Sequence, residues 1–246
     1  MAEEKKMEKG DIGHHISKQF NTELDGLRNR VLAMGGLIEK QIADAVTALA
    51  DADQDLANHV IKTDYQVNAM EVNIDEECTQ ILARRQPAAS DLRLIVAVIK
   101  TITDLERIGD QAEKVARISL RLAEEERPKD NYLELQNMGK LVQEMLNHAL
   151  DAFARMDVET AIKVAHKDLT VDNQYESIMR QRITHMMEDP RSITRSLDVM
   201  WASRALERIG DHAGNICEYV IYLVKGKDVR HISLEQMEKA ALDNDK

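Results

Sequence analysis

The hexapeptide LERIGD occurs twice in this sequence, and each copy carries two carboxylates four residues apart. The pairs are Glu106 with Asp110 and Glu207 with Asp211. Residues four apart lie on one face of an α-helix, so both acids of a pair point the same way. Like charges at this spacing repel by roughly 0.2–0.5 kcal/mol. The spacing therefore predicts a cation or a basic side chain between the acids of each pair.

Further oxygen ligands are expected on the helix that precedes each LERIGD helix. Asp64 and Asn68 are four residues apart there, and Asp168 with Asp172 repeats the spacing in the second half. Oxygen donors without thiols suit hard cations such as Mg²⁺, Mn²⁺ or Fe. The predicted metal ligands are Glu106, Asp110, Glu207, Asp211, Asp64, Glu71, Asp168 and Asp172.

An ion-pair network at a helix crossing is the alternative interpretation of the paired acids. Arg107 and Arg208 each stand three residues before the second acid of a pair. Gly109 and Gly210 favour a close approach by a backbone or a ligand shell, because glycine costs about 1 kcal/mol in a helix interior. His212 directly follows Asp211 and is predicted to be a solvated neighbour rather than a ligand.

The elements that position these acids are predicted to be helices. The chain has 3 Pro, 10 Gly and 3% aromatic residues, which is poor material for a sheet. Breaks are expected at the three prolines and at the N-cap candidates Asp53 and Asp157. The expected spans are 17–51, 54–85, 89–126, 132–156, 158–188 and 191–225. Spans of this length fit an elongated antiparallel bundle.

An internal repeat organises these helices. The stretch from Met34 matches the stretch from Met138 at an offset of 104, and the two LERIGD blocks match at an offset of 101. The offset pairs Gly35 with Gly139 and aligns the helix breaks at the two aspartates. The sequence therefore predicts an all-α fold of six long helices in two pseudo-symmetric three-helix bundles. The expected organisation is a flexible segment 1–15, bundles at 16–127 and 128–226, and a tail 227–246.

Composition excludes several classes of protein. Lys and Arg number 33 against 44 Asp and Glu, giving a net charge of −11, and no basic stretch stands out. Nucleic acid is therefore not an expected partner, because phosphate binding needs clustered positive charge. Cys78 and Cys217 stand alone in apolar helical patterns and are predicted to be buried free thiols. No apolar leader or membrane-length apolar run is present, so the expected location is cytoplasmic, without direct membrane insertion.

Three motifs together resemble the PhoU family: the duplicated LERIGD, the segment RQPAASDLR, and FNTELDGLRNRVLAMGG near the start. The resemblance covers the chain from about His14 to His231. It implies a two-bundle cytoplasmic protein that forms a homodimer and represses the phosphate-starvation regulon. It also implies coupling of the phosphate-specific ABC transporter to its sensor histidine kinase, with no enzymatic activity. The transporter ATPase subunit and the kinase are the expected partners.

The resemblance also implies metal clusters at the ExxxD motifs, here Glu106 with Asp110 and Glu207 with Asp211. The expected cofactors are divalent or trivalent ions of Mg, Mn, Fe or Zn. Tyr175 stands where Glu71 would repeat, and Asn68 stands where the second half has an aspartate, so the two sites need not bind alike.

The turn around Pro87 is a predicted docking surface. Arg85, Asp91 and Arg93 crowd this segment, which is among the most recognisable of the family resemblance. The alternative is local, because Ser90 or Asp91 would then only cap the following helix.

Two other function classes stay open. One is a metal-dependent enzyme that uses the carboxylate clusters to activate water, and the other is a purely structural helical dimer. The chain has no phosphate-cradling Gly-rich loop, no nucleophile with an evident base and no basic cleft, which favours an adaptor. Turnover assays with Mn²⁺, Mg²⁺ or Fe²⁺ separate the adaptor from the enzyme, and a deletion phenotype separates it from the structural dimer.

Overall fold

The computed structural model describes residues 9–125 and 132–242, with side chains described from residue 18 onward. The described residues form helices and connections without a strand, which confirms the predicted all-α class. In chain order the elements are α1 (Lys9–Asp51), α2 (Gln54–Thr63), α3 (Tyr65–Arg85), α4 (Ala89–Ala123), α5 (Leu133–Arg155), α6 (Val158–Glu188), the 3₁₀ turn η1 (Pro190–Ser192), α7 (Ile193–Lys225) and α8 (Leu234–Leu242).

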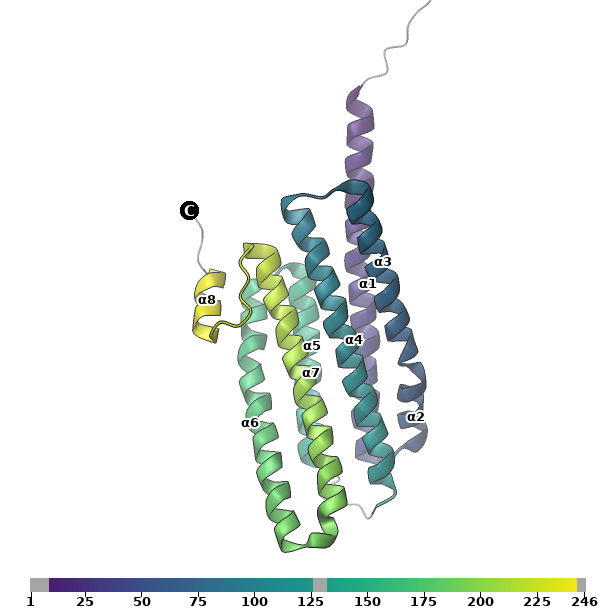
Figure 1. Ribbon diagram of the computed structural model, residues 1–246, viewed down its shortest axis with the longest axis vertical. Helices are drawn as coiled ribbons and strands as arrows, with labels where there is room; N and C mark the ends of the chain where they lie inside the picture. Colours follow the sequence, from purple (N-terminus) through teal and green to yellow (C-terminus); the bar gives the residue numbers. More distant parts are fainter. Residues whose placement is uncertain (1–8, 126–131, 243–246) are drawn as a thin grey trace, which may run out of the picture.

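The long helices form two three-helix bundles that lie side by side. One contains α1, the α2–α3 segment and α4, and the other contains α5, α6 and α7 (Figure 1). The bundles meet along α4 and α7, and α1 also contacts α5. Figure 1 shows an elongated body with its helices nearly parallel to the long axis. The predicted two-bundle arrangement is therefore confirmed.

Two aspartates begin corresponding helices of the bundles. Asp53 accepts a hydrogen bond from the amide of Leu56 at 2.9 Å, and Asp157 accepts one from the amide of Thr160 at 3.1 Å. Each bond satisfies a backbone donor that has no partner within the helix. Both predicted N-caps are confirmed.

In the contact between α1 and α5, residues related by the sequence repeat make equivalent contacts. A Cβ placed on Gly35 would lie 2.5 Å from Leu150 Cδ1, and one on Gly139 would lie 2.5 Å from Val46 Cγ2. The contacts are reciprocal, because positions 46 and 150 are themselves related by the offset of 104. Glycine at both positions lets the two helices approach closely, and the pair marks the pseudo-twofold relation between the bundles.

The predicted second helix, 54–85, is interrupted once. α2 ends at Thr63 and α3 begins at Tyr65, although Asp64 between them keeps helical angles of φ −57° and ψ −35°. The Val67 amide donates to the Asp64 carbonyl at 2.9 Å, which is the tighter bonding pattern of a 3₁₀ turn. Asp64, at this interruption, is buried in the first bundle, with 7% of its surface exposed.

The chain ends also differ from expectation. α1 begins at Lys9, so only part of the predicted flexible segment 1–15 lies outside the described residues. α4 ends at Ala123 rather than at residue 126, and the predicted break at Pro128 lies outside the described residues. The predicted tail contains α8, which packs against α6 and α7. Ser233 and Gln236 begin α8 with a reciprocal capping box.

Two further expectations concern single features of the chain. Cys78 and Cys217 are both buried free thiols, as predicted. Within the described ranges, no helix combines the length and the apolar character needed to cross a membrane.

Candidate functional site

The second bundle brings the predicted acids of α6 and α7 together. Asp172 on α6 and Glu207 and Asp211 on α7 each offer a carboxylate oxygen, and these atoms lie within 4.8 Å of one another. The four-residue spacing puts both α7 acids on the helix face that meets α6. Glu207 is buried, with 6% of its surface exposed.

Asp168 lies beside this group and is the most strongly perturbed acid in it. Burial raises the pKa of Asp168 to about 7, and the charges of Asp211, Asp172 and Glu207 add to the effect. A Cβ placed on Gly210 would lie 3.1 Å from Asp168 Oδ1, so glycine lets this carboxylate approach α7 closely. The carboxylates repel one another, and a cation between them would relieve that repulsion.

The pKa values of the two α7 acids shift in the same direction. Burial raises the pKa of Glu207, and the neighbouring charge of Asp211 adds to it. Burial likewise raises the pKa of Asp211, assisted by Asp172. Arg204 opposes both shifts and forms an ion pair with Glu207.

The predicted ligands of the first bundle lie around the corresponding part of α4, but among the described residues no three of their carboxylates come as close together as those of Asp172, Glu207 and Asp211. Burial raises the pKa of Glu106, with the charges of Asp110, Glu71 and Asp64 adding to it. Burial is also the largest cause of the raised pKa of Asp110, of Glu71 and of Asp64. A Cβ placed on Gly109 would lie 3.4 Å from Asp64 Oδ1. The four predicted first-half acids therefore share one electrostatic neighbourhood.

The donor atoms present fit a hard cation. Asp64 Oδ1, Asp168 Oδ1 and Glu207 Oε2 are buried, and none has a hydrogen-bond partner among the described residues. Unpartnered buried carboxylate oxygens are costly, and coordination of a cation offsets that cost. Both clusters offer oxygen ligands, as Mg²⁺ and Mn²⁺ prefer.

The alternative interpretation, an ion-pair network, applies to one side of the second cluster. The arginine that pairs with Glu207 is Arg204 rather than the expected Arg208. The Arg204 guanidinium also lies over the ring of Tyr175, 5.6 Å from its centroid. The signal for Arg204 in the sequence was its position three residues before Glu207. The charge of Arg208 only partly opposes the rise in the pKa of Glu207.

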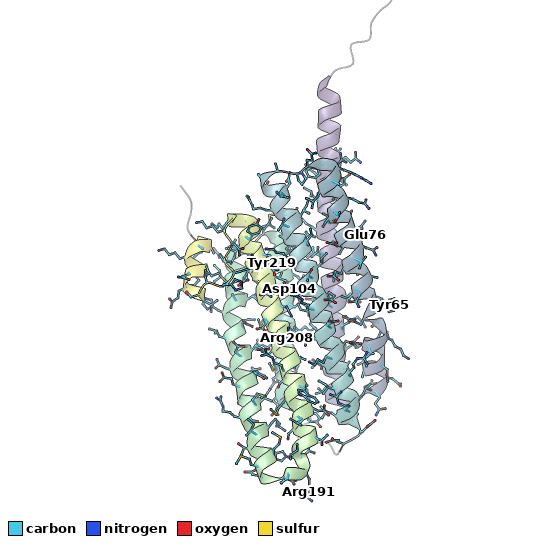
Figure 2. The ribbon with its side chains drawn as sticks, in the orientation of Figure 1. Tyr65, Glu76, Asp104, Arg191, Arg208 and Tyr219 are labelled. Carbon is cyan, nitrogen blue, oxygen red and sulfur yellow. The ribbon has the colours of Figure 1, made fainter. Side chains whose placement is uncertain are left out.

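His212 is not the solvated neighbour that the sequence predicted. Its side chain is buried, and its Nδ1 lies 2.7 Å from Asp104 Oδ1 on the other bundle. Asn215 and Tyr219 also donate to Asp104, at 3.1 and 2.7 Å, and Figure 2 shows Asp104 and Tyr219 close together along α4 and α7. Burial opposes ionisation of Asp104, but these bonds outweigh it and lower its pKa. The prediction was wrong because the periodicity of the helix around His212 gives no information about Asp104, which lies 108 residues earlier on another helix.

The predicted docking residues have contacts within the chain. Arg85 makes two bonds to Glu23, at 3.0 and 2.7 Å, and Arg93 Nε donates to the Leu223 carbonyl at 3.4 Å. Arg93 thus joins the start of α4 to the end of α7. Asp91 lies in the first turn of α4, whose N-cap residue has no side-chain capping bond. The predicted role of all three in partner binding stays a prediction.

Comparison with known proteins identifies relatives over almost the entire chain. The family model described as "PhoU domain" matches residues 31–119 and again 135–220. A Pseudomonas aeruginosa protein named phosphate-specific transport system accessory protein PhoU homolog is 57% identical over 236 residues, covering 96% of this chain and 98% of that protein. The Escherichia coli protein named phosphate-specific transport system accessory protein PhoU is 46% identical, covering 98% of this chain and all of that one.

Solved structures agree with these sequence matches. The crystal structure of PhoU from Pseudomonas aeruginosa has a TM-score of 0.82 at 58% identity, covering 85% of this chain and 100% of that one. The phosphate transport system regulatory protein PhoU from Streptococcus pneumoniae has a TM-score of 0.79 at 33% identity, covering 85% of this chain and 99% of that one.

Proposed function

The chain belongs to the PhoU domain family, and from this premise we propose that it is an accessory protein of a phosphate-specific transport system that regulates the response to phosphate starvation. In this proposal it represses the starvation response in high phosphate. It does so by coupling the phosphate-specific ABC transporter to a sensor histidine kinase in the cytoplasm.

The full-length similarity to proteins with that name carries the proposal. The Pseudomonas aeruginosa relative matches 96% of this chain, so the similarity includes both bundles and both acid clusters. The relatives are named as accessory or regulatory proteins. We therefore propose binding, rather than chemical turnover, as the mode of action.

Metal binding is the second part of the proposal. Asp172, Glu207 and Asp211, with Asp168 beside them, would hold a cation in the second bundle. Asp64, Glu71, Glu106 and Asp110 would hold one in the first. A bound cation supplies positive charge that neutralises the clustered carboxylates, and the acids orient it between two helices of one bundle.

A metal-dependent enzyme is the competing function, because the group of Asp172, Glu207 and Asp211 is also suited to activating water. Assays of the purified protein with Mn²⁺, Mg²⁺ or Fe²⁺ and phosphorylated substrates distinguish the two functions. The adaptor proposal expects no turnover above that of a protein with these acids replaced by amides.

Partner contacts complete the proposal. Asp91, Arg93 and Arg85 lie at the α3–α4 turn, which would dock the transporter ATPase subunit or the kinase. A second copy of the chain would form a homodimer, for which a specific interface buries on the order of 1,600 Å² in total.

The experiment that tests the function is deletion of the gene in the source organism. Alkaline phosphatase should then be produced constitutively in high phosphate, and the intact gene should restore repression. Normal repression in the deletion strain would contradict the regulatory role and favour a structural dimer.

A further inference from the structure

Gln41 of α1 is buried beside the first acid cluster and was not singled out by its sequence. Only 3% of its surface is exposed, and neither amide atom, Oε1 or Nε2, completes a hydrogen bond among the described residues, although the amide lies near enough to Asp64 to lower the pKa of that acid. A buried amide without partners is costly, so such a group calls for an explanation.

The position of Gly109 shows where this amide points. A Cβ placed on Gly109 would lie 3.4 Å from Gln41 Oε1 and 3.4 Å from Asp64 Oδ1. The two oxygens therefore converge on the same short stretch of α4 from two different helices. Gln41 also belongs to the wall of a cavity of about 130 Å³ between α1 and the α2–α3 segment, although both of its amide atoms are buried.

The corresponding place in the second bundle has no such amide. The atoms nearest a Cβ on Gly210 are Asp168 Oδ1 at 3.1 Å and the two methyl groups of Val171. The repeat offset of 104 pairs Gln41 with Met145, a fully buried thioether. Asp64 and Asp168 are thus equivalent, whereas their α1 and α5 neighbours differ in chemistry.

We infer that Gln41 determines the metal specificity of the first-half site. Its amide oxygen is an uncharged ligand for a hard divalent cation, and the second-half site has no equivalent ligand. This inference rests on the proposed metal binding. An amide oxygen is a good ligand for Mg²⁺ or Mn²⁺, whereas a thioether prefers soft ions. The two duplicated sites should therefore differ in affinity for such a cation.

The test uses the full-length protein with the second-half site removed by Asp168→Asn and Asp211→Asn. Mn²⁺ binding to the chelator-treated protein is followed by the loss of the free-ion EPR signal. Gln41→Met, which copies the second half, should weaken binding by about 10-fold or more, the scale for losing one supporting contact of a metal site. Gln41→Glu keeps an oxygen at this place and should bind Mn²⁺ more tightly. Gln66→Met, an exposed change on the wall of the same cavity, should leave binding unchanged.

A second measurement introduces an amide into the second half instead of removing one from the first half. Met145→Gln, in a protein whose first site is removed by Asp64→Asn and Asp110→Asn, should tighten Mn²⁺ binding. Circular dichroism and thermal unfolding establish that each variant is folded.

The outcomes separate the inference from the function on which it rests. A background that binds no Mn²⁺ would overturn metal binding by the first half, and the role of Gln41 with it. Binding that Gln41→Met leaves unchanged would overturn the role of Gln41 alone. Equal weakening by Gln41→Met and Gln41→Glu would also overturn it, since the amide would then serve as a hydrogen-bond donor or as packing.

Discussion

Asp168→Asn should stabilise the metal-free protein at alkaline pH and leave it nearly unchanged at acidic pH. Burial and neighbouring acids raise the pKa of Asp168 from 3.8 to about 7 in the folded protein. Between these values the folded protein binds a proton that the unfolded chain has released. Stability therefore falls as the pH rises from about 4 to 7, and the full penalty is present above pH 7.

The magnitude follows from the same numbers. The difference between 3.8 and about 7 corresponds to roughly 4 kcal/mol. Solvent screening of a side chain that is only partly buried reduces the expected contribution to about 1–2 kcal/mol. Asparagine is nearly isosteric and carries no charge, so it removes the repulsion without opening a cavity.

Urea unfolding of chelator-treated protein at pH 5 and pH 8 measures this effect. The Asp168→Asn protein should exceed the original in free energy of unfolding by about 1–2 kcal/mol at pH 8, and the difference should shrink at pH 5. Asp25→Asn, at an exposed position of α1, is the matched control and should show no such pH-dependent difference. Saturating Mn²⁺ should stabilise the original protein more than the variant at pH 8. A gain for the variant that is the same at both pH values would refute the electrostatic explanation.

Three further predictions concern packing, the contact between the bundles and docking. Gly139→Ala should destabilise the fold by about 1–3 kcal/mol through overpacking against Val46. Gly36→Ala, at a position with open space around it, is the control and should be neutral or stabilising by up to about 1 kcal/mol. Equal thermal midpoints for the two variants would contradict the close approach of α1 and α5. Asp104→Ala should cost about 3 kcal/mol or more in urea unfolding, because it leaves the buried His212 and the partly buried Asn215 and Tyr219 without their acceptor. A loss below about 1 kcal/mol would show that the network is dispensable. Asp91→Ala should keep its thermal midpoint yet lose repression of alkaline phosphatase, and full repression would count against docking at this turn.

The sequence predicted those features of the fold that local chemistry determines. The breaks at Asp53 and Asp157 were predictable because a short acid accepts an amide bond at a helix start. The two bundles were predictable because the repeat covers whole helices. The start of α8 carries its own signal, the capping box from Ser233 to Gln236, although the helix that follows is too short to show a long apolar periodicity.

Features that depend on a neighbouring helix were not predictable from one pattern. The acids of each LERIGD block were identified because their spacing lies within a single helix. Asp104 and His212 instead meet across the two bundles, and their periodicity in each helix resembles ordinary core. Gln41 is similar, since only the assembled bundle shows its amide beside Asp64. The interruption at Asp64 also has no local signal, because neither proline nor glycine stands there and its backbone angles stay helical.

Capture of partners is the measurement that tests regulation by binding most directly. The tagged full-length protein is used to pull down the transporter ATPase subunit and the sensor histidine kinase across phosphate and salt concentrations. Regulation by binding predicts that both are captured and that phosphate alters the amount captured. Salt should weaken capture, because the chain has a net charge of −11. Capture of neither partner under any condition, together with metal-dependent turnover of a phosphorylated substrate, would contradict regulation by binding and favour the metal-dependent enzyme.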